Sequence, residues 1–303
     1  MISIGEAFSS AIARTKRILF QPFDAGKWFT LGFCAFLANL CSGGGGGGGS
    51  RFNVPTGGGN TGSSGGPEFD ACARWVMGHL PLVITLGVLL AMFVITLMVV
   101  FQWLGSRGAF MFLDGVIRDR GSVVEPWHRF QKPGNNLFLF RLLLGLATLV
   151  LLALIAALAL GLAWHDLRSR HFGAGAVVAL ATGLPLFILW ALGASLLDQV
   201  LTDFVVPIMY RRGISTMSAL RVWWRELVPG HGWEFVSFYL LKLALALAAF
   251  IAILLGTCCT CCLAALPYIG TVFFLPLYVF FRCYSLGFLE QFGEEWTQTP
   301  VED

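Results

Sequence analysis

Residues 80–104 read LPLVITLGVLLAMFVITLMVVFQWL, an apolar run of 25 residues without a charged side chain. At 1.5 Å per residue, this run forms a helix of about 37 Å, longer than the roughly 30 Å hydrocarbon core of a bilayer. A helix that is apolar on all sides is buried in the core of a large protein or in lipid. The stretch therefore predicts a membrane-spanning helix.

Five further apolar runs occur along the chain, so the sequence predicts an all-α, polytopic integral membrane protein with six transmembrane helices. Hydrophobic residues make up 57% of the chain and charged residues 12%, about half the charged share of soluble domains. The first run covers only about 21 Å, so it must extend backward or lie in thinned bilayer. The predicted spans are residues 28–41, 80–104, 137–164, 174–197, 233–255 and 263–281.

Basic residues are concentrated in alternate connections between the predicted spans. The other connections carry only Arg51, Arg74, Arg168 and Arg170. Because connections rich in Lys and Arg stay on the cytoplasmic side, both termini are predicted to be cytoplasmic. The basic residues that set this orientation are Arg14, Lys16, Arg17 and Lys27, then Arg107, Arg118, Arg120, Arg129 and Lys132, then Arg211, Arg212, Arg221 and Arg225.

A short segment of similar design precedes each odd-numbered span. Ser3, Ser122 and Ser215 stand where a helix N-cap is expected, and Glu6 and Glu125 complete capping boxes after the first two. A proline ends each segment, and the span that follows has an aromatic residue in its first two positions. The sequence therefore predicts three repeats, each an interfacial amphipathic helix followed by a transmembrane hairpin. The closing prolines are Pro22, Pro133 and Pro229.

The predicted organisation is a single membrane domain over residues 1–303, because the connections are too short to form a soluble catalytic domain. Its glycine-rich stretch of residues 42–66 is expected to be a disordered external loop. The predicted parts are a first interfacial helix and span (1–41), the loop (42–66), a second span and return (67–121), a second repeat (122–213), a third repeat (214–289) and an acidic tail (290–303).

The first and third short helices are amphipathic. One apolar stripe contains Ile4, Phe8, Ala11, Ile12, Ile18 and Leu19, and the other contains Met217, Leu220, Trp224 and Leu227. Arginines lie on the polar sides, which predicts helices in the inner headgroup layer that contact anionic lipid. The alternative is that both helices pack against the protein's own spans. The predicted lipid-contacting residues are Arg14, Lys16, Arg17, Arg221 and Arg225.

Five ionisable residues lie within or near the cytoplasmic ends of the predicted spans. A charge at the centre of the hydrocarbon costs at least about 2.5–3.5 kcal/mol, so these groups should pair or extend toward the interface. Two interpretations follow. The five residues form a ring of structural ion pairs that joins the repeats, or a path for a substrate or ion is lined by Arg141, Asp198, Asp203 and Lys242. The residues are Arg141, Asp198, Asp203, Lys242 and Arg282.

The cysteines allow a disulfide and, at residues 258–262, either apolar packing at a tight turn or metal binding or redox chemistry. Cys41 and Cys72 flank the glycine-rich loop on the predicted external side, where an oxidising compartment permits a disulfide between them. The closely spaced cysteines of residues 258–262 lack the two separated pairs of a structural zinc site. No nucleophile–base pair, paired carboxylates or metal-ligand spacing is present, so we expect no catalytic residue, no metal and no cofactor.

Several short strings carry a resemblance to known proteins: IGEAF at residues 4–8, ILFQPF at 18–23, KWF at 27–29 and the return RRG at 211–213. With the serine-capped helices and proline breaks, they resemble uncharacterised bacterial multi-span membrane proteins. These are similar to the YciC-like family and to the membrane domain fused to some glycerophosphodiester phosphodiesterases. The resemblance implies a multi-pass fold in a bacterial cytoplasmic (inner) membrane. It implies no activity, because the phosphodiesterase chemistry belongs to a separate soluble domain.

These observations predict a non-enzymatic membrane scaffold or accessory subunit that contacts anionic lipid. The alternative is a small transporter or channel, which internal repeats and prolines within spans favour. Expected partners are membrane lipids and an unidentified membrane protein or a second copy of the chain. A nucleic-acid partner is not expected, because the net charge is only +3 and no Lys/Arg block occurs.

Overall fold

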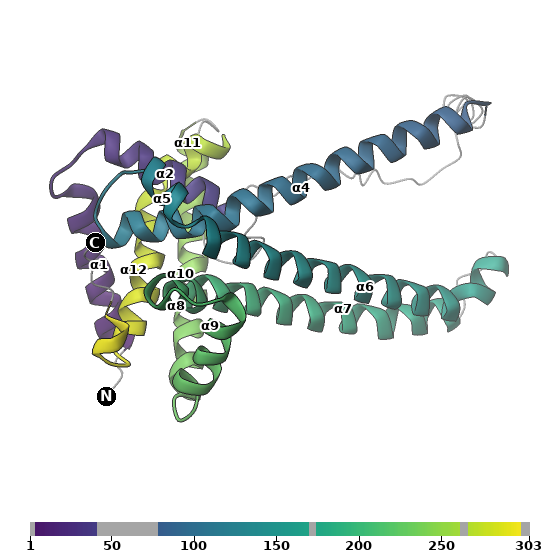
Figure 1. The fold of residues 1–303 in the computed structure, drawn as a ribbon. Coiled ribbons are helices and arrows are strands. Elements are labelled where there is room, and N and C mark those ends of the chain that lie inside the picture. The colour runs from purple at the N-terminus through teal and green to yellow at the C-terminus, as the bar shows by residue number, and fades with distance from the viewer. Residues whose placement is uncertain (1–3, 41–77, 170–173, 261–265, 298–303) are drawn as a thin grey trace. The chain divides into compact units, whose positions relative to one another are not determined.

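The computed structural model describes residues 4–40, 78–169, 174–260 and 266–297, and within these ranges all regular structure is helical (Figure 1). The prediction of an all-α protein is confirmed. The elements are α1 (Ile4–Phe20), α2 (Ala25–Asn39), α4 (Leu80–Ile117), α5 (Val124–Arg129), α6 (Gln131–Ser169), α7 (Ala174–Val200), the π turn η1 (Leu201–Val205), α8 (Val206–Arg212), α9 (Thr216–Val222), the π turn η2 (Trp223–Leu227), α10 (Gly232–Cys259), α11 (Pro267–Phe273), α12 (Leu275–Glu290) and the 3₁₀ turn η4 (Glu294–Trp296).

The chain divides into two compact units. One unit contains residues 1–49 and 102–303, and the other contains residues 50–101, including the first part of α4. The larger unit holds the buried core and all of the sites described below. In the smaller unit, nearly every side chain of residues 80–101 is exposed despite being apolar.

Four helices in the described part of the chain are long and apolar enough to cross a membrane. In the most apolar stretch of the first two, none of the residues is buried by the protein. Side chains of this kind, uncovered on all sides of a long helix, match a lipid environment rather than water. The prediction of helices long and apolar enough to span a membrane is confirmed for these four runs. They are Leu80–Ile117, Gln131–Leu162, Val177–Arg212 and Gly232–Cys259.

The first and last predicted spans have a different form. Helix α2 has 15 residues, which corresponds to about 22 Å. The run 263–281 is divided between α11 and α12, and the helix is interrupted at Phe274. Pro276 lies in the first turn of α12 and has no N–H for the carbonyl of Val272, which favours a break between α11 and α12. Neither run is a single helix of spanning length.

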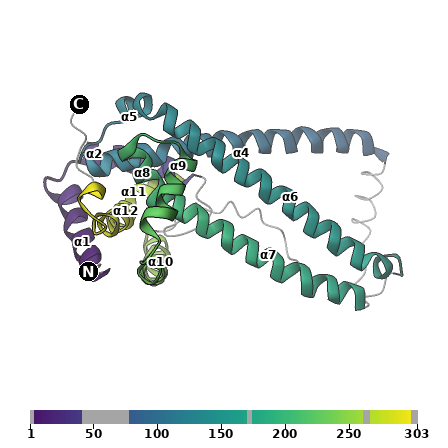
Figure 2. The ribbon, with the colours of Figure 1, turned by 60° about the horizontal axis from the view of Figure 1, so that its bottom comes forward.

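Helices α6 and α7 lie side by side as an antiparallel hairpin in both views (Figures 1 and 2). The core of the larger unit lies where η1, α10 and α12 meet. Phe204 is at its centre, with ring centroids 5.3 Å from Phe235, 5.4 Å from Phe238 and 6.0 Å from Phe288. Such aromatic pairs add attraction beyond the apolar area that they bury.

Helix α1 packs along α12 (Figure 1). Its buried side contains Ala7, Ala11 and Ile18, whereas Ile12, which we expected in the apolar stripe, is 48% exposed. The close approach requires Gly287 on α12, because a Cβ there would lie 2.8 Å from the hydroxyl oxygen of Ser10. The apolar face of α1 therefore contacts the protein itself, as in the alternative interpretation.

The three short segments that precede the odd-numbered predicted spans differ in how their helices are capped. Ser215 caps α9 and accepts a hydrogen bond from the Ser218 amide, as predicted. The predicted capping box at Ser122 is wrong: α5 begins after Val123 without a side-chain cap, and Glu125 instead pairs with Arg120 at 2.8 Å. Pro133 lies in the first turn of α6 rather than at the end of α5. Ser3 lies outside the described residues.

A proline stands two residues after the end of each π turn: Pro207 follows η1, and Pro229 follows η2. In η1 the amide of Val206 bonds the carbonyl of Leu201, five residues earlier. Proline has no N–H, and its ring clashes with the carbonyl four residues before it. A widened turn ahead of the proline accommodates both effects.

Candidate polar site at the η1 turn

The π turn η1 presents polar groups within an otherwise apolar segment. Following the register of the turn, the carbonyl of Thr202 would accept a hydrogen bond from residue 207, which is a proline without an N–H. This carbonyl therefore lacks a helical partner. Asp203, one residue on, is buried. Buried polar groups require partners from other helices, and the structure supplies three cations.

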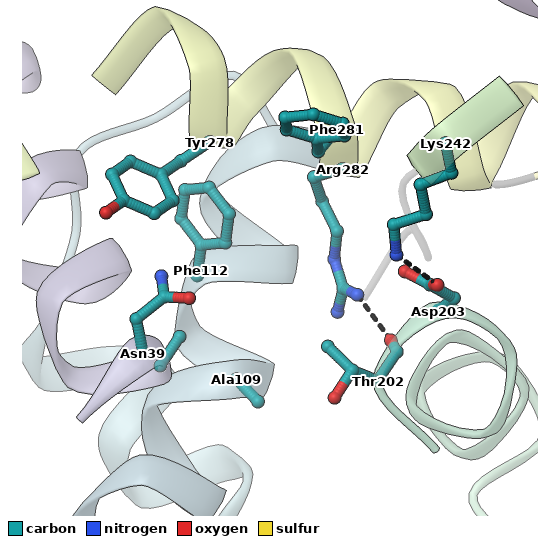
Figure 3. Close-up of a pocket in the computed structure, with 10 residues that line it drawn as sticks. Asn39, Ala109, Phe112, Thr202, Asp203, Lys242, Tyr278, Phe281 and Arg282 are labelled. Atoms are coloured by element: carbon teal, nitrogen blue, oxygen red, sulfur yellow. Dashed lines mark hydrogen bonds and ion pairs between the residues drawn. The ribbon is translucent and has the colours of Figure 1, made fainter. Parts of the chain in front are cut away.

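Two ion pairs join the η1 region to its neighbours. Arg141 on α6 pairs with Asp198 on α7 at 3.0 Å and donates to the Thr202 hydroxyl at 2.9 Å. Lys242 on α10 donates to the carboxylate of Asp203, and both side chains are buried (Figure 3). The side chains of Lys242 and Asp203, which are 39 residues apart in sequence, thus meet at this turn.

Arg282 on α12 reaches the same turn from another direction. Its Nη1 donates to the carbonyl of Thr202 at 2.5 Å, so this donor replaces the amide missing at Pro207. Its Nε and Nη2 are buried and have no acceptor among the described residues. Figure 3 shows the guanidinium extending from α12 between Phe112 and Lys242 toward Thr202. Arg282 thus has buried donors in excess of its partners.

A small cavity of about 80 Å³ adjoins these groups. It has room for a few water molecules or a small ion, and it is well below the 300–1,000 Å³ of pockets for drug-sized ligands. Part of its wall is aromatic and part is polar (Figure 3). The lining residues are Ala38, Asn39, Ala109, Phe112, Thr202, Asp203, Lys242, Tyr278, Phe281 and Arg282.

The structure thus brings the five predicted intramembrane ionisable residues to one site. Four of them form two ion pairs, and the fifth, Arg282, bonds the backbone between them. The predicted disulfide partners Cys41 and Cys72 lie outside the described residues. Within the described part of the chain, no group of three or more His, Cys, Asp or Glu side chains is arranged to hold a metal ion.

The predicted lipid-contacting residues separate into two groups. Arg14 forms a bidentate ion pair with Glu290, in which Nη1 lies 2.8 Å from Oε1 and Nη2 lies 2.5 Å from Oε2. The bonds to Glu290 raise the pKa of the Arg14 guanidinium above its usual value. Arg221 and Arg225 are exposed, and the neighbouring Glu226 pairs with Arg212 instead at 3.2 Å.

Helix α9 and η2 present an exposed face that combines these arginines with apolar side chains. Met217 and Trp224, which we expected in one apolar stripe with Leu220 and Leu227, are 55% and 64% exposed, whereas Leu227 is buried. Residues 217, 221, 224 and 225 follow the spacing of one helix face, and the opposite face buries Ala219 and Leu227. We call residues 217, 221, 224 and 225 the α9 face.

Sequence reasoning missed a buried acid at the end of α4. The Asp114 side chain accepts from the Tyr210 hydroxyl at 2.8 Å and lies 3.3 Å from Arg118 and 3.6 Å from Arg120. The signal was available, because an aspartate in an apolar run four residues before an arginine predicts an ion pair on one helix face. This cluster connects α4 with α8.

Arg107 is a second missed residue. Its guanidinium carbon lies 4.3 Å from the ring centroid of Trp103 and 4.9 Å from that of Trp127. It also donates to the side-chain oxygen of Asn135 at 3.1 Å. Two aromatic faces and one amide offset the burial of this charge. No acidic residue lies nearby in sequence to indicate this arrangement.

A protein-family model described as a family of unknown function (DUF7544) matches residues 2–278. The chain belongs to this family. No curated protein and no solved structure matches the chain. The polar site lies within the DUF7544 match except for Arg282, which follows shortly after it. Membership in DUF7544 confirms the expectation of an uncharacterised family, whereas the resemblance to the YciC-like and phosphodiesterase-associated families stays a prediction.

Proposed function

We propose that this protein is a non-enzymatic scaffold or accessory subunit of a bacterial cytoplasmic membrane that contacts anionic lipid through the α9 face. The observation that carries the proposal is the exposed combination of Trp224 and Met217 with Arg221 and Arg225. Tryptophan prefers the membrane–water interface, and arginine close to an anionic surface gains about 1 kcal/mol. A face with both side-chain types fits the headgroup layer.

The α9 face supports this role better than α1 does. The apolar side of α1 is covered by α12, and Arg14 is held by Glu290. Lys16 and Arg17 remain exposed on α1 and can add to the attraction. The polar site supports a structural role as well. One ion pair joins α6 to α7 and the other joins α10 to η1, and in each pair one positive charge meets one negative charge.

The proposal includes the six-span topology with both termini in the cytoplasm. In this topology α2 and the α11–α12 pair cross as shorter or interrupted segments beside the four long helices. Interrupted helices are tolerated at membrane depth where protein or a neighbouring helix satisfies the freed backbone groups. The Trp28 side chain on α2 bonds the carbonyl of Val272 on α11 at 2.9 Å, which is a contact of this type.

A small transporter or channel is the second proposal, with a path lined by Asp198, Asp203, Arg141 and Lys242. The cavity beside Asp203 and Lys242 favours it. The matched ion pairs weigh against it, because a path for ions requires groups that can exchange partners.

Lipid preference tests the first proposal directly. Full-length protein in detergent is titrated with phosphatidylglycerol or phosphatidylcholine, and bound lipid is counted by native mass spectrometry. Arg221→Gln and Arg225→Gln should each weaken phosphatidylglycerol binding by about fivefold, the equivalent of about 1 kcal/mol. Phosphatidylcholine binding should not change, because it carries no net charge.

Arg14→Gln is the matched control, because it removes the same charge from a residue that Glu290 already neutralises. This variant should keep the wild-type preference for phosphatidylglycerol. Raising the salt concentration should weaken the preference of the wild type, since the Debye length falls below about 8 Å above physiological ionic strength. Unchanged phosphatidylglycerol binding by an Arg221→Gln/Arg225→Gln double variant would contradict the proposal.

A further inference from the structure

The charges at the cavity beside η1 do not balance. Asp203 is neutralised by Lys242, and Arg141 is neutralised by Asp198. Among the described residues, Arg282 donates to a backbone carbonyl and pairs with no carboxylate, so the site keeps one positive charge. An isolated charge in a buried setting is costly, and a counter-charge is the usual compensation.

The unused donors of Arg282 lie on one edge of its guanidinium. Nη1 is occupied by the Thr202 carbonyl, whereas Nε and Nη2 have no acceptor in the described part of the chain. These two nitrogens form the fork that binds an anion through two parallel N–H bonds. Arg282 is only 6% exposed, so bulk water cannot solvate this edge freely.

The cavity next to this fork has the size of a small ion. Its volume of about 80 Å³ fits a small ion better than a bulky organic ligand. The ammonium of Lys242 lines the same cavity and can donate a further hydrogen bond (Figure 3). Asn39 also lines the cavity, but its side-chain nitrogen donates to the carbonyl of Ala35 at 2.7 Å. Phe112 and Tyr278 form the aromatic part of its wall.

We propose that this cavity binds a small monovalent anion, such as a halide or nitrate, on the Nε and Nη2 donors of Arg282. The anion neutralises the unmatched charge and completes the polar site that joins η1, α10 and α12. Binding is therefore coupled to the stability of the larger unit, because the folded protein binds the anion and the unfolded chain does not. This role is independent of lipid contact at the α9 face.

The test uses the purified full-length protein in a neutral detergent. Thermal unfolding is followed while sodium gluconate is replaced by sodium chloride or nitrate at constant ionic strength. Wild-type protein should show a melting temperature that rises with the small anion and then saturates. The line width of the ³⁵Cl NMR signal should broaden with protein and recover when nitrate competes.

Two variants locate the site. Arg282→Gln should lose both the anion-dependent rise and the line broadening. Asp203→Asn leaves the Lys242 ammonium unmatched beside the cavity and should tighten chloride binding severalfold, so chloride should also raise its melting temperature more than that of the wild type. If Arg282→Gln does not fold, the chloride dependence of the wild type and its competition by nitrate still test the proposal. Arg14→Gln, which also removes an arginine contact of α12, should leave the anion dependence as in the wild type.

The outcomes separate the alternatives. If chloride and gluconate give the same melting curve and no line broadening occurs, water alone satisfies Arg282 and the proposal is overturned. An anion effect that persists in Arg282→Gln, or that Asp203→Asn leaves unchanged, also overturns the assignment to this cavity. Lipid preference is read by a different experiment, so a negative result here does not affect the α9 face.

Discussion

At the scale of single residues, Thr202 joins the turn η1 to two other helices. Its hydroxyl accepts from Arg141 on α6, and its carbonyl accepts from Arg282 on α12. The next residue, Asp203, binds Lys242 on α10. A proline five residues after Thr202 makes this possible, because it leaves the carbonyl without a helical donor.

The buried pair of Asp203 and Lys242 should be sensitive to removal of one partner. Lys242→Met leaves the Asp203 carboxylate buried without its cation, which should lower the stability by about 3–5 kcal/mol. The double variant Lys242→Met/Asp203→Leu should recover most of this loss, because no unpaired charge remains. Thermal unfolding in detergent measures both effects.

Arg14→Met is the control for that experiment, because it breaks the ion pair with Glu290 in which the arginine side chain is 42% exposed. Its loss should stay below about 1 kcal/mol, since water screens exposed pairs. Equal losses in Arg14→Met and Lys242→Met would show that burial does not determine the strength of these pairs.

At the scale of elements, close packing depends on glycines where helices meet. A Cβ at Gly108 on α4 would lie 2.6 Å from the amide nitrogen of Ala38 and from the Cβ of Leu37 on α2. The obstacle is largely backbone, which cannot move aside like a flexible side chain. Small residues that permit such contact are typical of helix pairs in membranes.

Gly108→Ala should therefore destabilise the protein by about 1–3 kcal/mol, the usual cost of overpacking. Gly87→Ala on the same helix is the matched control, because its added methyl group meets no atom within 4 Å. The control should be neutral or slightly stabilising, since alanine favours helix over glycine. A neutral Gly108→Ala in thermal unfolding would show that α2 and α4 are not in backbone contact.

At the scale of the whole molecule, the number of crossings determines the topology. Four crossings by the long helices alone would put both termini on the same side as the glycine-rich loop of residues 42–66. Six crossings, with α2 and the α11–α12 pair included, put the termini on the opposite side from that loop. The connection between α8 and α10 lies opposite the loop in both cases.

Single cysteines in a cysteine-free background distinguish the two topologies. Ser9→Cys, Ser63→Cys and Ser218→Cys place one thiol in the N-terminal helix, the loop and the α9 region. With six crossings, a membrane-impermeant thiol reagent applied to intact cells labels only Ser63→Cys. Labelling of Ser9→Cys together with Ser63→Cys would favour four crossings, and labelling of Ser218→Cys would reverse the predicted orientation.

The sequence by itself determined the long helices, because lipid-facing helices satisfy their backbone locally and hydropathy records that directly. The run predicted at residues 174–197 is α7 at Ala174–Val200. Only the tertiary structure decided which charges meet, since Lys242 and Asp203 are 39 residues apart and hydropathy carries no information on partners. It also decided that α12 covers the apolar side of α1, because an amphipathic stripe fits lipid and protein equally well. The unmatched charge of Arg282 arises in the same way, from helices that converge only in three dimensions.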